Sequence, residues 1–420
     1  MRTAQRATDL SAFLRKFQGG EELTLFSSAG PTFTDTLRIG SYTVTRYTNE
    51  YWTSRQRQAS SIHEVSYRAC FKPQLPHFFI ELLAAEADST VYDPFSGRGT
   101  TVIEAGLMGR RFVSNDINPL SEILARPRFY IPDLRKVSER LDKIQPSRRL
   151  QADRDLSMFY HPDTESEIVA LKDYLRERLA SGEEDDADRW IRMVATNRLT
   201  GHSAGFFSVY TLPPNQAVTP KAQIKINQKL KQKPEYRNTR KVILRKSKSL
   251  ASRLSREDKA RLRESADNSL FLCRDARSTP EIADASIDLT VTSPPFLDVV
   301  QYPQDNWLRC WFNSIDVEQI ASHITICKTL EDWRAVMRSV FVELHRITKR
   351  GGWVAFEVGE VRSGKINLDE QVVPLGIEAG FICQGILVNQ QKFTKTSNIW
   401  GIRNNQRGTN TNRIVLFQKD

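Results

Sequence analysis

The sequence of 420 residues has few cysteines and no long hydrophobic run. An odd number of dispersed cysteines without a Cys-x-x-Cys pair excludes a disulfide framework and argues against a structural zinc site, so we expect no metal. No apolar segment approaches the roughly 18 residues of a membrane-spanning helix. Residues 1–17 carry arginines and lack the continuous apolar block of a secretory signal. These absences predict a protein of a reducing cytoplasm with no membrane contact.

Positive charge is abundant and concentrated in one stretch. The chain carries a net charge of +11, and residues 221–263 alone contain 16 lysines and arginines against three acidic residues. The rest of the chain is therefore close to neutral. A basic block in a neutral protein indicates contact with a polyanion, and nucleic acid is the favoured partner. The alternative is a solvated helical face.

A short apolar run at 287–291 predicts a buried strand, and Ser293, Pro294, Pro295 and Phe296 follow its end. Two consecutive prolines cannot continue a strand ladder, because they lack N–H donors and fix φ. The chain must therefore leave the strand as a rigid loop. The serine hydroxyl and a proline carbonyl can accept two hydrogen bonds from an amino group while a planar base stacks on the phenylalanine. The alternative is a proline-terminated strand with a core phenylalanine.

A second loop of interest follows the predicted strand at 90–93. Gly97 and Gly99 let the backbone come close to a ligand and adopt φ values that a Cβ forbids. The helix predicted from Thr100 presents free N–H groups and the positive end of its dipole. Asp116 ends the next strand, about twenty residues beyond the glycines, where dinucleotide folds bind a ribose diol. Asp116 is therefore expected to accept hydrogen bonds from a ribose, and it can also cap the next helix.

The stretch Asp-Pro-Phe-x-Gly-x-Gly-Thr-Thr at 93–101, taken with Ser-Pro-Pro-Phe, resembles the amino-methyltransferases of DNA. These enzymes use S-adenosylmethionine to methylate exocyclic nitrogens of cytosine or adenine. The resemblance covers residues 63–130 and 268–418. It implies an α/β fold, a Rossmann-like class I methyltransferase with a seven-stranded mixed sheet, plus a mainly helical inserted domain. The two loops then lie side by side at the carboxyl edge of one sheet.

The α/β rhythm stops at about 131 and resumes after 265, which is too long an interval for a connection. We therefore predict three parts: 1–130, the N-terminal segment and first part of the catalytic domain; 131–265, an inserted basic target-recognition domain; and 266–420, the second part of the catalytic domain. A helix is expected at 331–349, ended by Gly351 and Gly352. The strands predicted in the sheet are 90–93, 110–116, 270–277, 287–291, 353–359, 381–388 and 413–417.

The resemblance implies a set of cofactor-binding residues. Asp93 is expected near the cofactor ammonium group and Asp275 at the adenine amino group. Lys72 is expected at the carboxylate, or else in solvent. His63 is the weaker candidate for a general base, because a lone histidine is more often structural. The expected cofactor-binding residues are Lys72, Asp93, Phe95, Ser96, Gly97, Gly99, Thr100, Asp116, Ile117, Asp275 and Ala276.

The basic block suits phosphate contacts in the recognition domain, with double-stranded DNA as the expected partner. The nucleic-acid-binding residues expected there are Lys221, Lys225, Lys229, Lys231, Arg240, Lys241, Arg245 and Lys246. A nuclease constellation is missing, so any restriction endonuclease partner is expected on a separate chain. The resemblance implies a nucleoid-associated enzyme of bacterial or phage type.

The resemblance also implies that Ser293, Pro294, Pro295 and Phe296 carry the catalysis, on a base flipped out of the duplex. No Pro-Cys pair is present, which excludes the cysteine nucleophile of cytosine-C5 methylation. Serine before Pro-Pro-Phe is typical of enzymes that methylate the N4 of cytosine. The alternatives are N6 methylation of adenine in DNA and an amino-methyltransferase of RNA.

Overall fold

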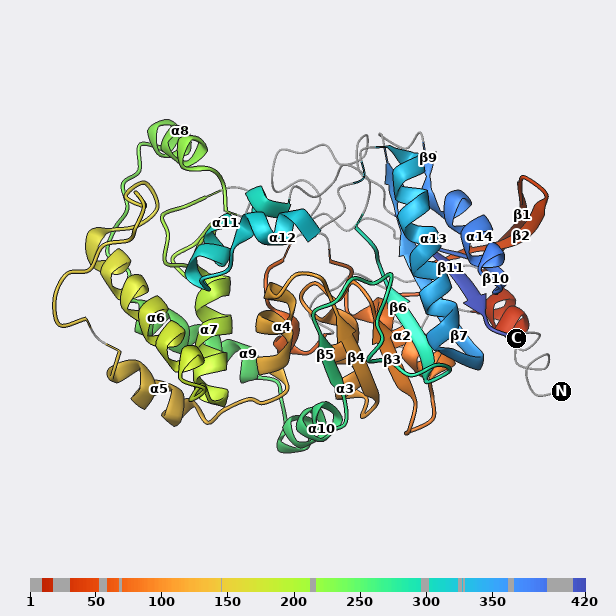
Figure 1. Ribbon diagram of the computed structural model, residues 1–420, viewed down its shortest axis with the longest axis horizontal. Coiled ribbons are helices and arrows are strands. Elements are labelled where there is room, and N and C mark those ends of the chain that lie inside the picture. Colours follow the sequence, from red (N-terminus) through yellow and green to blue (C-terminus); the bar gives the residue numbers. More distant parts are fainter. Residues whose placement is uncertain are drawn as a thin grey trace.

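The computed structural model describes residues 10–17, 31–52, 59–67, 70–144, 146–211, 217–295, 302–323, 327, 329–361, 366–390 and 411–420. Strands occur at β1 Phe33–Ile39, β2 Tyr42–Asn49, β3 Thr90–Asp93, β4 Arg111–Asn115, β5 Leu270–Leu272, β6 Ile287–Thr292, β7 Thr348–Val358, β8 Glu360–Val361, β9 Ile366–Asn367, β10 Ile382–Gln390 and β11 Thr411–Gln418. β8 and β9 form a separate small ladder. The other nine form one sheet in the order β1-β2-β10-β11-β7-β6-β3-β4-β5 (Figure 1).

Helices cover both faces of this sheet. The helices are α2 Gln74–Leu83, α3 Thr100–Leu107, α4 Leu120–Ala125, α5 Leu134–Asp142, α6 Pro162–Ala180, α7 Asp186–Arg198, α8 Pro220–Leu230, α9 Thr239–Ala251, α10 Arg256–Asp267, α11 Tyr302–Phe312, α12 Val317–His323, α13 Leu330–Ile347 and α14 Leu368–Glu378, with 3-10 turns η2 Ser61–His63 and η3 Arg126–Arg128. No helix in the described residues is long and apolar enough to cross a membrane.

The strand residues alternate between two hydrophobic clusters, as the two-residue period of a strand requires. Val91 of β3 packs with α2 and α3, whereas its neighbour Tyr92 packs with α13 and α14. Trp353 and Val354 of β7 divide in the same way. Strands that are apolar on both faces form a buried central sheet, which is typical of parallel α/β folds.

The predicted α/β architecture is confirmed, but the predicted count of seven sheet strands is wrong. All seven predicted strands are present, and the hairpin of β1 and β2 adds two more. β2 pairs parallel with β10, whose edge would otherwise be open. The loosely alternating, threonine-rich stretch at 33–49 has only half of its faces buried, so its pattern alone did not identify a strand pair.

The predicted end of the helix at 331–349 is also wrong. α13 ends at Ile347, and β7 begins at the next residue. Gly351 and Gly352 lie inside β7, where the N–H of Gly351 donates to the carbonyl of Lys419 at 2.7 Å. The glycines therefore serve the strand, because a Cβ on Gly352 would lie 2.9 Å from the Lys349 carbonyl oxygen.

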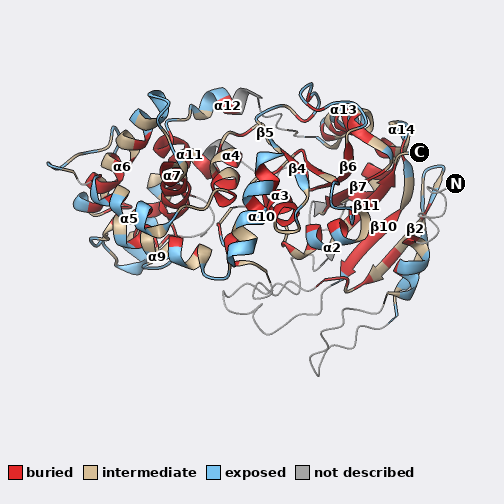
Figure 2. Cartoon of the chain, turned by 90° about the horizontal axis from the view of Figure 1, so that it is seen from below, coloured by how far each residue is buried: buried red, intermediate tan, exposed pale blue. Residues whose placement is uncertain are grey.

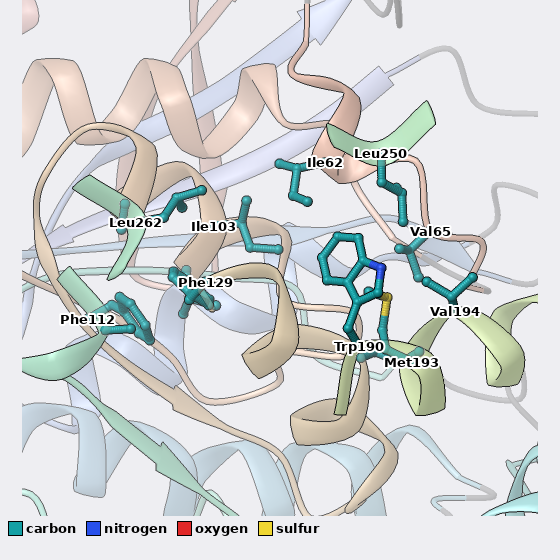
Figure 3. Packing of buried hydrophobic residues seen from close by; sticks show 14 of the residues in the cluster. Ile62, Val65, Ile103, Phe112, Phe129, Trp190, Met193, Val194, Leu250 and Leu262 are labelled. Atoms are coloured by element: carbon teal, nitrogen blue, oxygen red, sulfur yellow. The ribbon is translucent and has the colours of Figure 1, made fainter. Parts of the chain in front are cut away.

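The helices between 131 and 265 share one hydrophobic cluster with the sheet. Figure 3 shows Trp190 and Met193 of α7 close to Ile62 and Val65, and all four belong to this cluster. The buried residues run from the sheet into α7 (Figure 2). α10 packs against α3 of the sheet layer, where Leu262 lies close to Gly106. The predicted insertion is therefore packed onto the catalytic part rather than linked to it by a tether.

Candidate functional site

The two loops singled out in the sequence meet at one edge of the sheet. β3 and β6 are parallel neighbours, with Val91 opposite Leu289, so both strands end on the same side. The Thr292 hydroxyl donates to the Asp93 carboxylate at 2.6 Å. Farther along, the Thr101 hydroxyl donates to the carbonyl of Val291 at 3.0 Å. The predicted adjacency of the glycine loop and the Ser-Pro-Pro loop is confirmed.

The glycine loop depends on backbone conformations that favour glycine. Gly97 has a φ of 53° and Gly99 a φ of 78°, and Gly99 is the N-cap of α3. A Cβ on Gly99 would lie 2.7 Å from the Ala125 Cβ, so α4 can approach the loop only if this residue is glycine. The buried Ser96 hydroxyl donates to the Asp93 carbonyl at 3.1 Å, and the Thr100 hydroxyl accepts from Arg98 at 3.1 Å. Both side chains thus hold the loop in shape.

Asp116 lies directly beside this loop. One carboxylate oxygen accepts the Gly97 N–H at 2.8 Å and the other accepts the Asn118 N–H at 3.0 Å. Burial raises the pKa of Asp116 to about 6, against the lowering effect of these two bonds. The residue is half-buried, so its remaining lone pairs are available to a ligand. α4 begins at Leu120, whose N–H is capped by Asn118, so a capping role for Asp116 is wrong.

Asp93 faces the interior, with a side chain that is 1% exposed. Besides the Thr292 hydroxyl, its carboxylate accepts the Phe95 N–H at 3.1 Å. Burial raises the pKa of Asp93 to about 7, although these hydrogen bonds favour the carboxylate. The Asp93 carboxyl therefore joins the two loops. Phe95 and Ile117 stand half-buried next to it and to Asp116 in the sequence.

Two further expected cofactor residues differ in their surroundings. Lys72 is half-buried, and burial, followed by the nearby Arg98, lowers its pKa. Within the described residues no ion pair of Lys72 with a carboxylate is found, so the ammonium suits an anionic ligand group. Asp275 pairs with Arg277, whose hydrogen bonds outweigh burial and lower the pKa of Asp275. Ala276 is buried beside it.

The Ser-Pro-Pro loop contacts two elements that the sequence did not connect with it. The Ser293 hydroxyl donates to the Glu357 carboxylate of β7, which also accepts the Asn412 amide at 3.0 Å. Glu357 is 7% exposed, and burial raises its pKa. The Trp333 indole N–H donates to the Pro295 carbonyl at 3.0 Å. Pro294 is buried, and Phe296 lies outside the described residues.

Sequence reasoning missed Glu357 and Tyr67. An acidic residue inside the apolar strand 353–358 was a signal for Glu357, because an unpaired carboxylate is rarely placed in a buried strand. Tyr67 contacts the glycine loop: a Cβ on Gly97 would lie 3.6 Å from its ring, and its hydroxyl accepts the Asn118 side-chain amide at 3.0 Å. No spacing rule links residue 67 with residue 118.

His63 has a structural role, as the sequence favoured. Its Nε2 lies 2.6 Å from the Glu104 carboxylate, and His77 approaches the other carboxylate oxygen at 3.0 Å. Glu104 is buried on α3, yet the two imidazoles outweigh burial and hold the pKa of Glu104 at about 2. The described residues contain no group of three or more His, Cys, Asp or Glu side chains that could hold a metal ion.

The basic residues between 221 and 246 fall into two groups. Lys221, Lys225 and Lys229 repeat at four-residue intervals on α8 and are exposed, as are Lys231, Lys241 and Arg245. Figure 1 shows α8 at the same side of the molecule as β9 and α12. By contrast, Arg240 pairs with Asp142 at 2.6 Å and Lys246 with Glu64 at 3.5 Å. These two cations are already engaged within the protein.

A parallel sheet with a glycine loop and a carboxylate after the next strand defines an α/β domain suited to a nucleoside ligand. Residues 29–124, which include the loop and Asp116, match the N6/N4 methyltransferase family model, described as DNA methylase. This part of the chain belongs to the N6/N4 DNA methylase family. S-adenosylmethionine is the methyl donor of that family.

Curated relatives agree with this assignment. The chain is 28% identical over 118 residues to the type II methyltransferase M.BsoBI of Geobacillus stearothermophilus, covering 26% of this chain and 23% of that protein. It is 31% identical over 97 residues to the type II methyltransferase M.MvaI of Kocuria varians, covering 23% and 20%. The matched region therefore spans less than a quarter of the length of either relative.

Solved structures of methyltransferases are also similar to the chain. A DNA modification methylase of Thermus thermophilus, complexed with S-adenosyl-L-methionine, is 21% identical, with a TM-score of 0.20 and coverage of 34% of this chain and 53% of that one. The rRNA methyltransferase aviRa of Streptomyces viridochromogenes is 11% identical, with a TM-score of 0.35 and coverage of 88% and 94%.

Proposed function

We propose that the protein is an S-adenosylmethionine-dependent DNA methyltransferase that methylates the exocyclic N4 of cytosine. The observation that carries this proposal is the 2.6 Å hydrogen bond between Thr292 and Asp93. It joins the end of the strand that leads to Ser293 directly to the strand that leads to the glycine loop. A cofactor at the loop and a base at Ser293 would thus be neighbours.

The side chains around the loop fit S-adenosylmethionine. Asp116 is held by two backbone N–H groups and is half-buried, so it would accept the ribose hydroxyls. The half-buried Lys72 would bind the carboxylate of the methionine moiety. Gly97 and Gly99 would let the ligand lie close to the backbone, while Asp275 and Ala276 would border the adenine. When bound, the cofactor supplies an electrophilic methyl group.

Ser293 would act on the amino group of the target base. A hydroxyl has one proton and two lone pairs. Because the Ser293 proton is directed to Glu357, both lone pairs are free to accept a hydrogen bond from the amino group. With the Pro294 carbonyl as a second acceptor, the amino nitrogen is held in a fixed orientation, so that positioning rather than a strong base lowers the barrier. Phe296 would stack on the flipped base.

DNA would approach from the side of α8. Its three exposed lysines lie on one face of the helix and would contact successive phosphates. Lys231, Lys241 and Arg245 extend the same basic surface. Any restriction endonuclease that shares the recognition sequence would be a separate chain.

Product analysis tests the proposal. The protein is incubated with duplex DNA and isotopically labelled S-adenosylmethionine, the DNA is digested to nucleosides, and the methylated nucleoside is identified by mass and retention time. N4-methylcytosine is the expected product. N6-methyladenine would move the assignment to the other base of the same family. Methylation of RNA with none of DNA would refute the proposed substrate.

A further inference from the structure

We propose that Tyr67 is a positioning residue that holds Asp116 in place to bind the ribose of S-adenosylmethionine. This inference rests on the proposed function, because it concerns the same cofactor site. It goes beyond that function by naming a residue outside the glycine loop that determines how well the loop binds.

Tyr67 touches both residues that donate hydrogen bonds to Asp116. Its hydroxyl accepts the Asn118 side-chain amide at 3.0 Å, and the backbone N–H of Asn118 donates to Asp116 at 3.0 Å. Its ring lies over Gly97, since a Cβ at Gly97 would be 3.6 Å from the Tyr67 Cε1. The backbone N–H of Gly97 donates to the other Asp116 oxygen at 2.8 Å. One tyrosine therefore restrains both partners of the carboxylate.

Three parts of the protein fix Tyr67 in turn. The Arg309 guanidinium of α11 lies 5.5 Å from the centroid of the Tyr67 ring, and it donates to the Ser66 carbonyl at 3.2 Å. Asn197 of α7 donates to the same carbonyl at 2.9 Å. Arg98 of the glycine loop donates to the Val65 carbonyl at 2.8 Å. Tyr67 thus connects the cofactor loop with α11, the helix that follows the Ser-Pro-Pro loop, and with the helical insertion.

Tyr67 is not simply a core residue. It is half-buried and packs at the margin of the hydrophobic cluster, whereas tyrosines such as Tyr160 are buried within that cluster. Removing its hydroxyl keeps the ring contacts with Gly97 and Arg309. The hydroxyl therefore affects the orientation of Asn118 and, through it, of Asp116. A role limited to stability would leave ligand affinity unchanged.

Tyr67→Phe tests the inference in the full chain, with Tyr130→Phe as a matched control. Tyr130 also loses one hydrogen bond, to Asp267, on an exposed surface outside the site. Affinity for S-adenosylmethionine is measured by calorimetry from pH 5 to pH 8, with methyl-transfer kinetics and thermal unfolding alongside. Asn118→Ser is a second variant, because serine keeps an oxygen near the Leu120 N–H but lacks the amide donor.

We expect Tyr67→Phe and Asn118→Ser each to weaken cofactor binding about five- to tenfold, the loss of one net hydrogen bond. KM for the cofactor should rise by a similar factor, while kcat at saturating cofactor changes less than twofold. Loosening of Asn118 raises the pKa of Asp116, so the loss of binding in acid should begin at a higher pH. Tyr130→Phe should bind as the unaltered protein does.

Two results would overturn the inference. Unaltered affinity and pH dependence in Tyr67→Phe would do so, whether or not its melting temperature falls. A failure of the unaltered protein to bind S-adenosylmethionine would remove the proposed function and this inference with it. Normal binding by the unaltered protein and by both variants would remove the inference alone.

Discussion

The carboxyl edge of the sheet and the helical insertion use charged residues in different ways. At the sheet edge, Asp93 and Asp116 end neighbouring strands, and backbone N–H groups hold both carboxylates. In the insertion, Arg240 and Lys246 are paired with acidic residues, whereas Lys225 faces solvent on α8. A position at a strand end thus indicates the surroundings of a side chain, but a count of positive charges does not.

The physical reason lies in what fixes each side chain. Hydrogen-bond register places the end of β3 beside the end of β6, so the residues that follow have little freedom. Helices have no such register with their neighbours, and their faces are chosen by apolar packing. α8 has only Gln223 buried, which leaves its lysines to solvent or to a ligand. α9 packs Val242 and Ile243 inward and carries Arg240 and Lys246 to acidic partners.

Ser293→Ala should produce the largest effect and defines the sheet edge as the seat of chemistry. Loss of the hydroxyl removes an acceptor for the amino group and leaves Glu357 with one partner fewer, so methyl transfer should fall about 100-fold or more. Cofactor affinity should stay within twofold, because Ser293 lies outside the glycine loop. Rates are measured with labelled cofactor, and Ser252→Ala at the exposed C-cap of α9 is the control. A Ser293→Ala protein that methylates at the normal rate would refute its role.

A pair of glycine substitutions compares the two regions directly. Gly99 and Gly182 have similar φ values, 78° and 72°. A Cβ at Gly99 meets Ala125 at 2.7 Å, whereas a Cβ at Gly182, in the turn between α6 and α7, meets nothing within 4 Å. Gly182→Ala should therefore lower the unfolding free energy by about 1–2 kcal/mol, the penalty of a left-handed backbone.

Gly99→Ala should lower the unfolding free energy further, because the clash adds to the same backbone strain. Urea denaturation of both variants measures the difference, and cofactor affinity should fall only in Gly99→Ala. Equal destabilisation of the two variants would show that α4 can move away from the loop without penalty.

Neutralising two lysines of α8 sharpens the comparison from the side of the insertion. Lys225→Gln with Lys229→Gln should weaken DNA binding and reduce the slope of log affinity against log salt by about 2, since each phosphate contact contributes about 0.9. Lys136→Gln with Lys143→Gln, within and at the end of α5 at the lower side of Figure 1, is the matched control and should leave the slope unchanged. Titrations of labelled duplex at several salt concentrations give the slopes. Equal losses in both pairs would indicate only a general effect of charge.

The smallest effect concerns pH. The pKa of Asp116 is raised by burial to about 6, and its ribose contacts require the carboxylate. Binding of S-adenosylmethionine should therefore be constant above pH 6 and weaken below it, by up to about tenfold per pH unit. Asp116→Asn should bind weakly with little pH dependence between 5 and 8. Asp275→Asn is the control that keeps the dependence, because the pKa of Asp275 is lowered. A pH-independent affinity in the unaltered protein would contradict the role of Asp116.

Much of the site followed from local sequence. Gly97, Gly99 and Asp116 were identified by their spacing behind predicted strands, and the seven strands predicted for the sheet are all present. Local sequence failed where the decisive contact comes from another element. Glu357 was recorded only as part of a strand, and its contact with Ser293 depends on the pairing of β6 with β7.

The sequence by itself determined the α/β architecture, the two strand-terminal loops and the concentration of positive charge, because each depends on residues close together in the chain. Only the tertiary structure decided which cations are exposed, which carboxyl Ser293 contacts, and that Tyr67 lies over Gly97. Those relations join residues far apart in the chain, and they arise from strand register and side-chain packing, for which a single sequence contains no local pattern.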